Sequence, residues 1–215
     1  DLHRRRHSFP TRRSSDLGMD EVESWYFELW KDDRLNMMDE KGWYFDCFEI
    51  GYHALKRISD RIKVGGAGFA LGYDRYQYHQ LIQNWKKQKV KPDFISMYSY
   101  SYLLIQQDSM YFGKRSLDNN FVKNQTDIFK QVLQEEEFMA EELHITEWNY
   151  TISNRNCISD SCAHGAYVMK TCIESIGNVD KMGYWHGSDL HTEYPRIRGE
   201  CAFQTYSGSW QVWIP

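Results

Sequence analysis

The chain has 215 residues, of which 41% are hydrophobic and 16% aromatic, so it can bury one core of domain size and is not a disordered chain. Its net charge of −4 becomes about −7 when the arginine-rich first 17 residues are set apart, which argues against direct binding of nucleic acid. No apolar run approaches the roughly 20 residues that span a bilayer, and five irregularly spaced cysteines predict reduced thiols in a cytoplasmic protein with no metal or other cofactor.

The first 17 residues differ in composition from the rest of the chain. They hold five arginines, three serines and two histidines, and they lack the apolar stretch of a signal peptide. The stretch "HSFPTRRSSDL" resembles the conceptual translation of a common sequencing adapter. We therefore expect residues 1–17 to be a disordered, non-native segment and residues 18–215 to form the domain, with its natural beginning lost before Gly18.

Strands and helices alternate after this segment. Short aromatic or β-branched runs predict strands at 24–30, 62–70, 92–102, 143–150 and 179–190, with a glycine-rich turn ending the second. Apolar residues at helical spacing predict helices at 42–61, 76–89, 120–142 and 161–176. The buried stripes of the first two helices are expected to be Phe45, Phe48, Tyr52, Leu55 and Ile58, and then Tyr78, Leu81, Ile82 and Trp85.

This order of elements predicts an α/β fold with a parallel sheet, because strands joined through helices pair in parallel. A doubly wound sheet and a (β/α)₈ barrel both fit it. The stretch "VGGAGFALG" lacks the G-x-G-x-x-G spacing of a dinucleotide site. Charged and aromatic residues just past the strand ends favour the barrel, in which function lies at the C-terminal face.

Two carboxylates occupy such positions. Asp32 follows the first strand in "ELWKDD", and Glu147 ends the fourth in "ITEWN". Cleavage of a glycosidic bond needs a pair of carboxyl groups in this setting, one as acid and base and the other as nucleophile. Taken alone, each of them would more often be an ordinary acid at a strand end.

The motifs "FELWKDD", "VGGAGF", "DFISMYSY", "ITEWN" and "GYWHGSD" occur in this order and resemble family 39 glycoside hydrolases over roughly residues 24–207. This is a retaining family of β-xylosidase and α-iduronidase type with a (β/α)₈ barrel. The resemblance implies that the chain is the C-terminal half of a barrel, strands four to eight with their helices. Its expected ligand is a carbohydrate, and no binding to a membrane or to nucleic acid is expected.

The resemblance also implies roles for individual residues. Asp32 takes the place of the acid/base Glu, and Glu147 that of the nucleophile. The residues expected to contact the sugar are Lys31, Tyr98, Tyr100, Trp185 and His186.

Three of these positions depart from the family pattern. Asp32 is one methylene shorter than Glu, and misplacement of a catalytic group by ~1 Å can lower a rate on the order of 100-fold. Lys31 replaces an Asn that would bind the sugar, and Tyr98 replaces a His.

Strand alternation predicts which side chains share the barrel interior. If Asp32 points inward, Glu28 does too, and a buried Glu28 then needs a cationic or hydrogen-bonding partner. An inward Glu147 places Ile145 in the core and turns Trp148 outward.

Two functions remain in view. The first is a retaining glycosidase acting on xylosides. The second is a catalytically impaired sugar-sensing barrel of a helix-turn-helix regulator whose DNA-binding part lies upstream, and an unrelated α/β protein is a third possibility. A half-barrel on its own is expected to aggregate through its exposed edges. The oligomeric state is left open, and Cys157 and Cys162 would pair only in an oxidising compartment.

Overall fold

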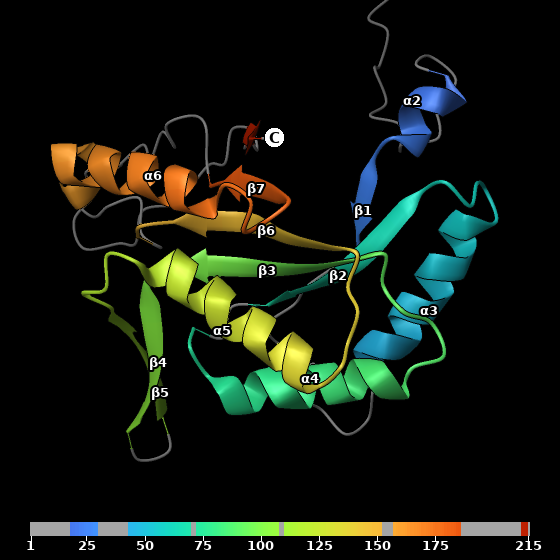
Figure 1. Cartoon of the computed structure of the whole chain (residues 1–215), viewed down its shortest axis with the longest axis horizontal. Coiled ribbons are helices and arrows are strands. Elements are labelled where there is room, and N and C mark those ends of the chain that lie inside the picture. Colours follow the sequence, from blue (N-terminus) through green and yellow to red (C-terminus); the bar gives the residue numbers. More distant parts are fainter. Residues whose placement is uncertain are drawn as a thin grey trace, which may run out of the picture.

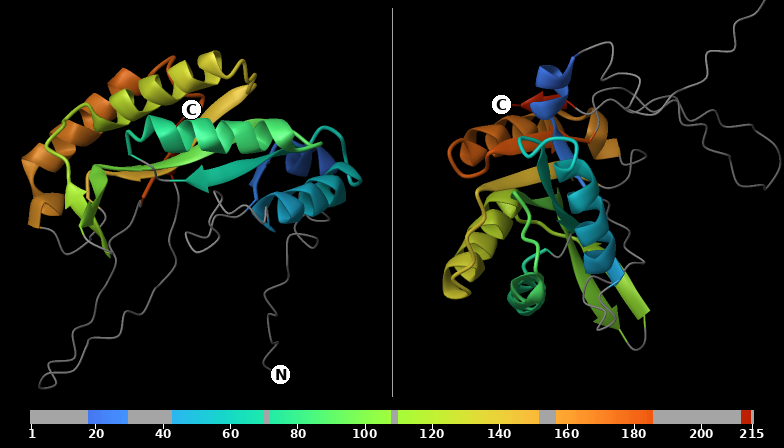
Figure 2. Two further views of the ribbon diagram at one scale, coloured as in Figure 1. Left: turned by 90° about the horizontal axis from the view of Figure 1, so that it is seen from below. Right: turned by 90° about the vertical axis from the view of Figure 1, so that its right-hand side faces the viewer.

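The structure is a computed structural model that describes residues 18–29, 43–69, 72–107, 110–151, 157–185 and 212–214. Within these ranges the chain forms a curled half-barrel of five parallel strands with helices on its outer side (Figures 1 and 2). The predicted alternation of five strands and four helices is confirmed. The predicted foreign segment 1–17 lies outside the described residues.

The main sheet has the order β1-β2-β3-β6-β7-β8. All its pairs are parallel except the last, in which β8 runs antiparallel to β7. Because parallel strands end at the same edge, the residues that close each strand gather at one mouth of the half-barrel. The strands are β1 Tyr26–Glu28, β2 Lys63–Phe69, β3 Phe94–Tyr100, β6 Glu142–Asn149, β7 Lys181–Tyr184 and β8 Val212–Ile214.

Two of the helices begin at a capping side chain. The Asp74 side chain accepts a hydrogen bond from the Gln77 backbone N–H at the start of α4, and Ser161 does the same for His164 at the start of α6. Cys162, the first residue of α6, is a free thiol. The helices are α2 Met19–Glu23, α3 Trp43–Lys56, α4 Arg75–Lys87, α5 Phe121–Glu135 and α6 Cys162–Ser175, with a short 3₁₀ turn at Cys157–Asp160.

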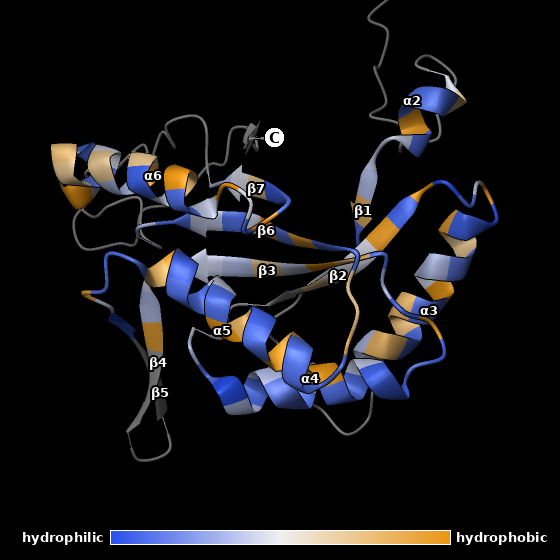
Figure 3. Ribbon diagram, in the orientation of Figure 1, coloured by the Kyte–Doolittle hydropathy of each residue, from blue (hydrophilic) through white to orange (hydrophobic). Residues whose placement is uncertain are grey.

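The core lies between the sheet and the helices α3, α4 and α5. The predicted stripe of α4 is fully buried, and Trp85 meets the rings of Phe45 and Phe48 edge to face at centroid distances of 4.8 and 4.7 Å. Edge-to-face contacts of this kind stabilise beyond the area they bury. The visible sides of α4 and α5 are largely hydrophilic, as expected for helices that cover a barrel (Figure 3).

Two sequence-based expectations about the helices are wrong. Ile58 is 60% exposed, because α3 ends at Lys56 and the stripe stops with it. The predicted helix 120–142 ends at Glu135, where Glu137 adopts a positive φ of 50° and the Phe138 N–H donates to the Leu133 carbonyl at 2.9 Å. This turn returns the chain to the core, in which Phe138 is buried.

Two features of the strands differ as well. An antiparallel hairpin, β4 (Tyr102–Gln107) with β5 (Met110–Arg115), follows β3 where no element was expected. The glycine-rich stretch is part of β2 itself and not a turn. A Cβ at Gly66 would come within 2.2 Å of the Tyr44 hydroxyl oxygen, so the strand needs glycine for the close packing of α3.

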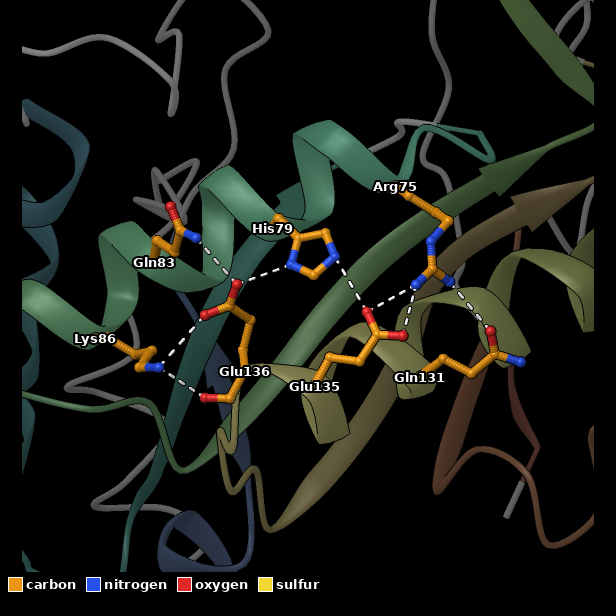
Figure 4. Close-up of polar contacts among 7 residues, drawn as sticks. All are labelled: Arg75, His79, Gln83, Lys86, Gln131, Glu135 and Glu136. Atoms are coloured by element: carbon orange, nitrogen blue, oxygen red, sulfur yellow. Dashed lines mark hydrogen bonds and ion pairs between the residues drawn. The ribbon is translucent and has the colours of Figure 1, made fainter.

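A row of polar contacts joins α4 to the end of α5 (Figure 4). Arg75 binds both carboxylate oxygens of Glu135 at 2.7 Å, and the His79 ring lies 2.8 Å from Glu136 and 3.2 Å from Glu135. Lys86 donates to the Glu136 carbonyl at 2.7 Å. The hydrogen bond from His79 is the largest of several contacts that lower the pKa of Glu136.

Candidate active site

Glu147 lies near the end of β6, at the C-terminal mouth of the half-barrel. The hydroxyl of Tyr100, the last residue of β3, donates a hydrogen bond to Glu147 Oε1. Burial, and then this contact with the carboxylate, raises the pKa of Tyr100 above its ordinary value. Tyr100 therefore remains a hydrogen-bond donor throughout the neutral pH range, and it holds one carboxylate oxygen in place.

A β-bulge directs Glu147 to this position. Met97 of β3 pairs with Ile145, but Tyr98 pairs with Glu147, so Thr146 is an extra residue on β6. Bulges of this kind often occur beside active sites, where they change the direction of a side chain. As a result Thr146 and Glu147 both face the barrel interior, although they are consecutive in the chain.

The bulge changes the simple alternation expected for β6. Ile145 is fully buried, as predicted, but it pairs with Met97 on the helix-covered face and does not share the face of Glu147. Trp148 faces outward as expected: it pairs with Ser99, whose hydroxyl binds Gln125 of α5 at 2.5 Å. Alternation alone could not show the extra residue.

Glu28, the last residue of β1, has the hydrogen-bonding partners that the sequence required. Its Oε1 accepts hydrogen bonds from the hydroxyls of Ser96 and Thr146, the latter at 3.0 Å. Glu28 is partly buried, whereas Ser96 and Thr146 are buried. Sequence reasoning missed these two hydroxyls. The available signal was that Ser96 and Thr146 are small polar residues that alternate with apolar ones along buried strands.

Trp185 follows the end of β7 and lies against the end of β6. The Asn149 amide donates to the Trp185 carbonyl at 2.5 Å, and the Trp185 N–H donates to the Trp148 carbonyl at 3.0 Å. Tyr184 packs its ring edge to face with Trp148 at 5.2 Å. These contacts place Trp185, one of the residues expected to contact the sugar, at the same mouth as Glu147 and Tyr100.

The remaining predicted site residues, Lys31, Asp32 and His186, lie outside the described residues. The pairing of Asp32 with Glu147 therefore stays a prediction. The structure brings together Tyr98, Tyr100 and Glu147 across adjacent strands, with Trp185 just past the end of β7 and hydrogen-bonded to the end of β6.

The opposite end of the barrel holds a different polar cluster. The Tyr26 hydroxyl donates to Glu142 at 2.9 Å, and the fully buried His144 ring lies 2.8 Å from the same carboxylate and stacks on Phe94 at 4.3 Å. Burial lowers the pKa of His144. Residues at the N-terminal face of such barrels serve stability, so we assign this cluster no part in the chemistry.

A parallel half-barrel with a hydrogen-bonded carboxylate at the strand ends has the form of part of a (β/α)₈ barrel, in which functional residues lie at this face. The model of the family described as "Glycosyl hydrolases family 39" matches residues 11–212. The chain therefore belongs to this family, which confirms the resemblance. The matched range begins inside residues 1–17, and the adapter origin of that segment stays a prediction.

Two curated relatives carry the name β-xylosidase. The one from Geobacillus stearothermophilus is 27% identical over 182 residues, which is 82% of this chain and 36% of the relative. The one from Caldicellulosiruptor saccharolyticus is 26% identical over 188 residues, with coverages of 83% and 36%. This chain thus spans about a third of the length of either relative.

Solved structures share the fold. A monomeric β-xylosidase from Caulobacter crescentus CB15 matches with a TM-score of 0.67 and 24% identity, over 85% of this chain and 38% of that one. A family 39 enzyme from Xanthomonas axonopodis pv. citri matches with a TM-score of 0.65 and 23% identity, over 81% and 35%. These likenesses confirm the predicted partial barrel.

Among the described residues, every helix is too short or too polar to cross a bilayer. The same residues contain no group of three or more His, Cys, Asp or Glu side chains that could hold a metal ion.

Proposed function

We propose that the protein to which this chain belongs is a retaining glycoside hydrolase that cleaves xylosides. Membership of family 39 supports the reaction class, and the names of the two curated relatives support the substrate class. The single observation that carries the assignment of the nucleophile is the Glu147 carboxylate at the strand ends, oriented by the Tyr100 hydroxyl.

The proposed reaction is a double displacement. The Glu147 carboxylate attacks the anomeric carbon while Asp32 protonates the leaving oxygen, which gives a covalent glycosyl-enzyme. Asp32 then removes a proton from water, which attacks the same carbon and releases Glu147. We expect Lys31, Tyr98 and His186 to contact the sugar and Trp185 to form the floor of its site.

The alternative of a sugar-sensing barrel in a transcriptional regulator gains no support from these relatives. It predicts sugar binding without turnover, so the same assay separates the two functions.

The test uses the full-length protein that carries this chain. Its hydrolysis of an aryl β-xyloside is compared with that of Glu147→Gln and Asp32→Asn, with Glu136→Gln as a matched control remote from the mouth. We expect Glu147→Gln to lose several orders of magnitude in kcat and Glu136→Gln to keep the wild-type value. NMR of the first product should show retained configuration. Xylose binding without turnover above the Glu147→Gln background would refute the hydrolase.

A further inference from the structure

We infer that Glu28 is a positioning residue for Glu147, acting through the extra residue of the β6 bulge. The inference rests on the proposed role of Glu147 as nucleophile. Glu28 and Thr146 are 118 positions apart in the chain, and the Thr146 hydroxyl donates to Glu28 Oε1 at 3.0 Å. The hydroxyl of Ser96 donates to the same oxygen. One carboxylate on β1 thus joins β3 and β6 inside the barrel.

The position of Thr146 makes this contact relevant to catalysis. Thr146 immediately precedes Glu147 and is the residue that the pairing with β3 leaves over. A bulge bends its strand and redirects the side chains beside it, so the contacts of the extra residue help to decide where the backbone lies. A movement of Thr146 would therefore carry Glu147 with it.

Backbone packing constrains the same residue from the other side. A Cβ at Gly183 of β7 would lie 2.6 Å from the Thr146 carbonyl oxygen and 3.2 Å from its carbonyl carbon. Glycine is required there because the bulge brings this carbonyl against β7. Thr146 is thus held by Glu28 through its side chain, and its carbonyl lies so close to β7 that no side chain fits at Gly183.

Tyr100 and Glu28 hold different parts of Glu147. Tyr100 holds the Glu147 carboxylate directly, whereas Glu28 holds the backbone from which that side chain extends. Hydrogen bonds to a charged acceptor are stronger than those between neutral groups, and they remain strong where the donors are buried, as Ser96 and Thr146 are. Glu28 does not need to touch the sugar for this role.

The test compares four variants of the full-length protein. Glu28→Ala removes the acceptor, and Glu28→Gln keeps an amide oxygen that can accept from both hydroxyls. Thr146→Val removes only the donor on the bulge. Thr126→Val is the matched control, since Thr126 is also buried and donates to a carbonyl at 2.8 Å, but within α5.

We expect Glu28→Ala to lower kcat on the order of 100-fold, the size of effect that a ~1 Å misplacement produces, with KM within about threefold of wild type. Thr146→Val should lower kcat by a smaller factor than Glu28→Ala does. Glu28→Gln should keep most of the wild-type kcat, and Thr126→Val should leave kcat unchanged. Unchanged kcat in Glu28→Ala, or equal losses in the Ala and Gln variants, would overturn the inference. If Glu28→Ala does not fold, the kcat of Thr146→Val is compared with that of Thr126→Val, and equal values would overturn the inference.

Crystal structures of the same variants separate this inference from the proposed function. We expect the Glu147 carboxylate to leave Tyr100 in Glu28→Ala and to stay in Glu28→Gln. A Glu147 that remains in place in Glu28→Ala overturns the positioning role whatever the activity. A wild-type protein without xyloside hydrolysis, but with this displacement in the variant, would overturn the hydrolase and leave the positioning role standing.

Discussion

Replacing Tyr100 by Phe removes a single hydroxyl and tests how far the Glu147 carboxylate depends on it. The hydroxyl donates to Glu147 Oε1 at the mouth of the barrel. A hydrogen bond to a charged group contributes about 1.5–3 kcal/mol, which corresponds to a loss of about 10- to 150-fold when it is made in the transition state. We therefore expect kcat/KM for an aryl β-xyloside to fall by that factor in the full-length protein.

Tyr78→Phe is the control for this experiment. Tyr78 lies on the buried face of α4, and its hydroxyl donates to the Gly72 carbonyl, far along the chain from Glu147. Its loss should lower the melting temperature without lowering kcat/KM. A Tyr100→Phe protein within twofold of wild type, or a Tyr78→Phe protein that loses as much activity, would refute the reasoning.

Three further predictions concern packing, the bulge and pH. Trp85→Ala should lower the free energy of unfolding by about 3–5 kcal/mol, measured by urea denaturation, whereas Tyr76→Ala on the same helix, 69% exposed, should change it by less than about 0.5 kcal/mol. Gly183→Ala should lower kcat even at temperatures at which the variant is fully folded, because the new Cβ displaces the Thr146 carbonyl. An unchanged kcat would contradict this. The pKa of Glu136 is lowered in the folded protein, so its contribution to stability is present above the unfolded pKa of about 4.3 and is lost as the pH falls through the folded value. The difference in urea midpoint between wild type and Glu136→Gln should therefore shrink on acidification below about pH 4.3, and a difference that does not change with pH would be inconsistent with it.

Much of the fold could be predicted because the relevant patterns are local. The apolar stripe of α4 recurs at helical spacing, and a Ser directly before α6 supplies its cap. The alternation of strand and helix requires parallel pairing, whatever the details of packing. The hairpin β4–β5 was missed because its two strands pair only with each other, outside that alternation.

The position of three candidate site residues at one edge of the sheet was predicted for the same reason. Tyr98, Tyr100 and Glu147 stand at strand ends, and parallel strands bring their ends to one edge. The need of Glu28 for hydrogen-bonding partners also followed from its expected inward direction. The identity of those partners did not, because Ser96 and Thr146 come from two other strands.

Residue chemistry and periodicity predicted a parallel α/β fold with a carboxylate at the strand ends, and the resemblance to family 39 predicted that the chain is half of a barrel. The direction of that carboxylate depends on a β-bulge at Thr146, and this bulge is defined only by the register of β6 with β3. Register is a property of two strands that are far apart in the chain, and neither strand carries it alone. The contact between Glu28 and Thr146 arises in the same way, since it forms only when the sheet has curled and brought β1 and β6 to the same interior.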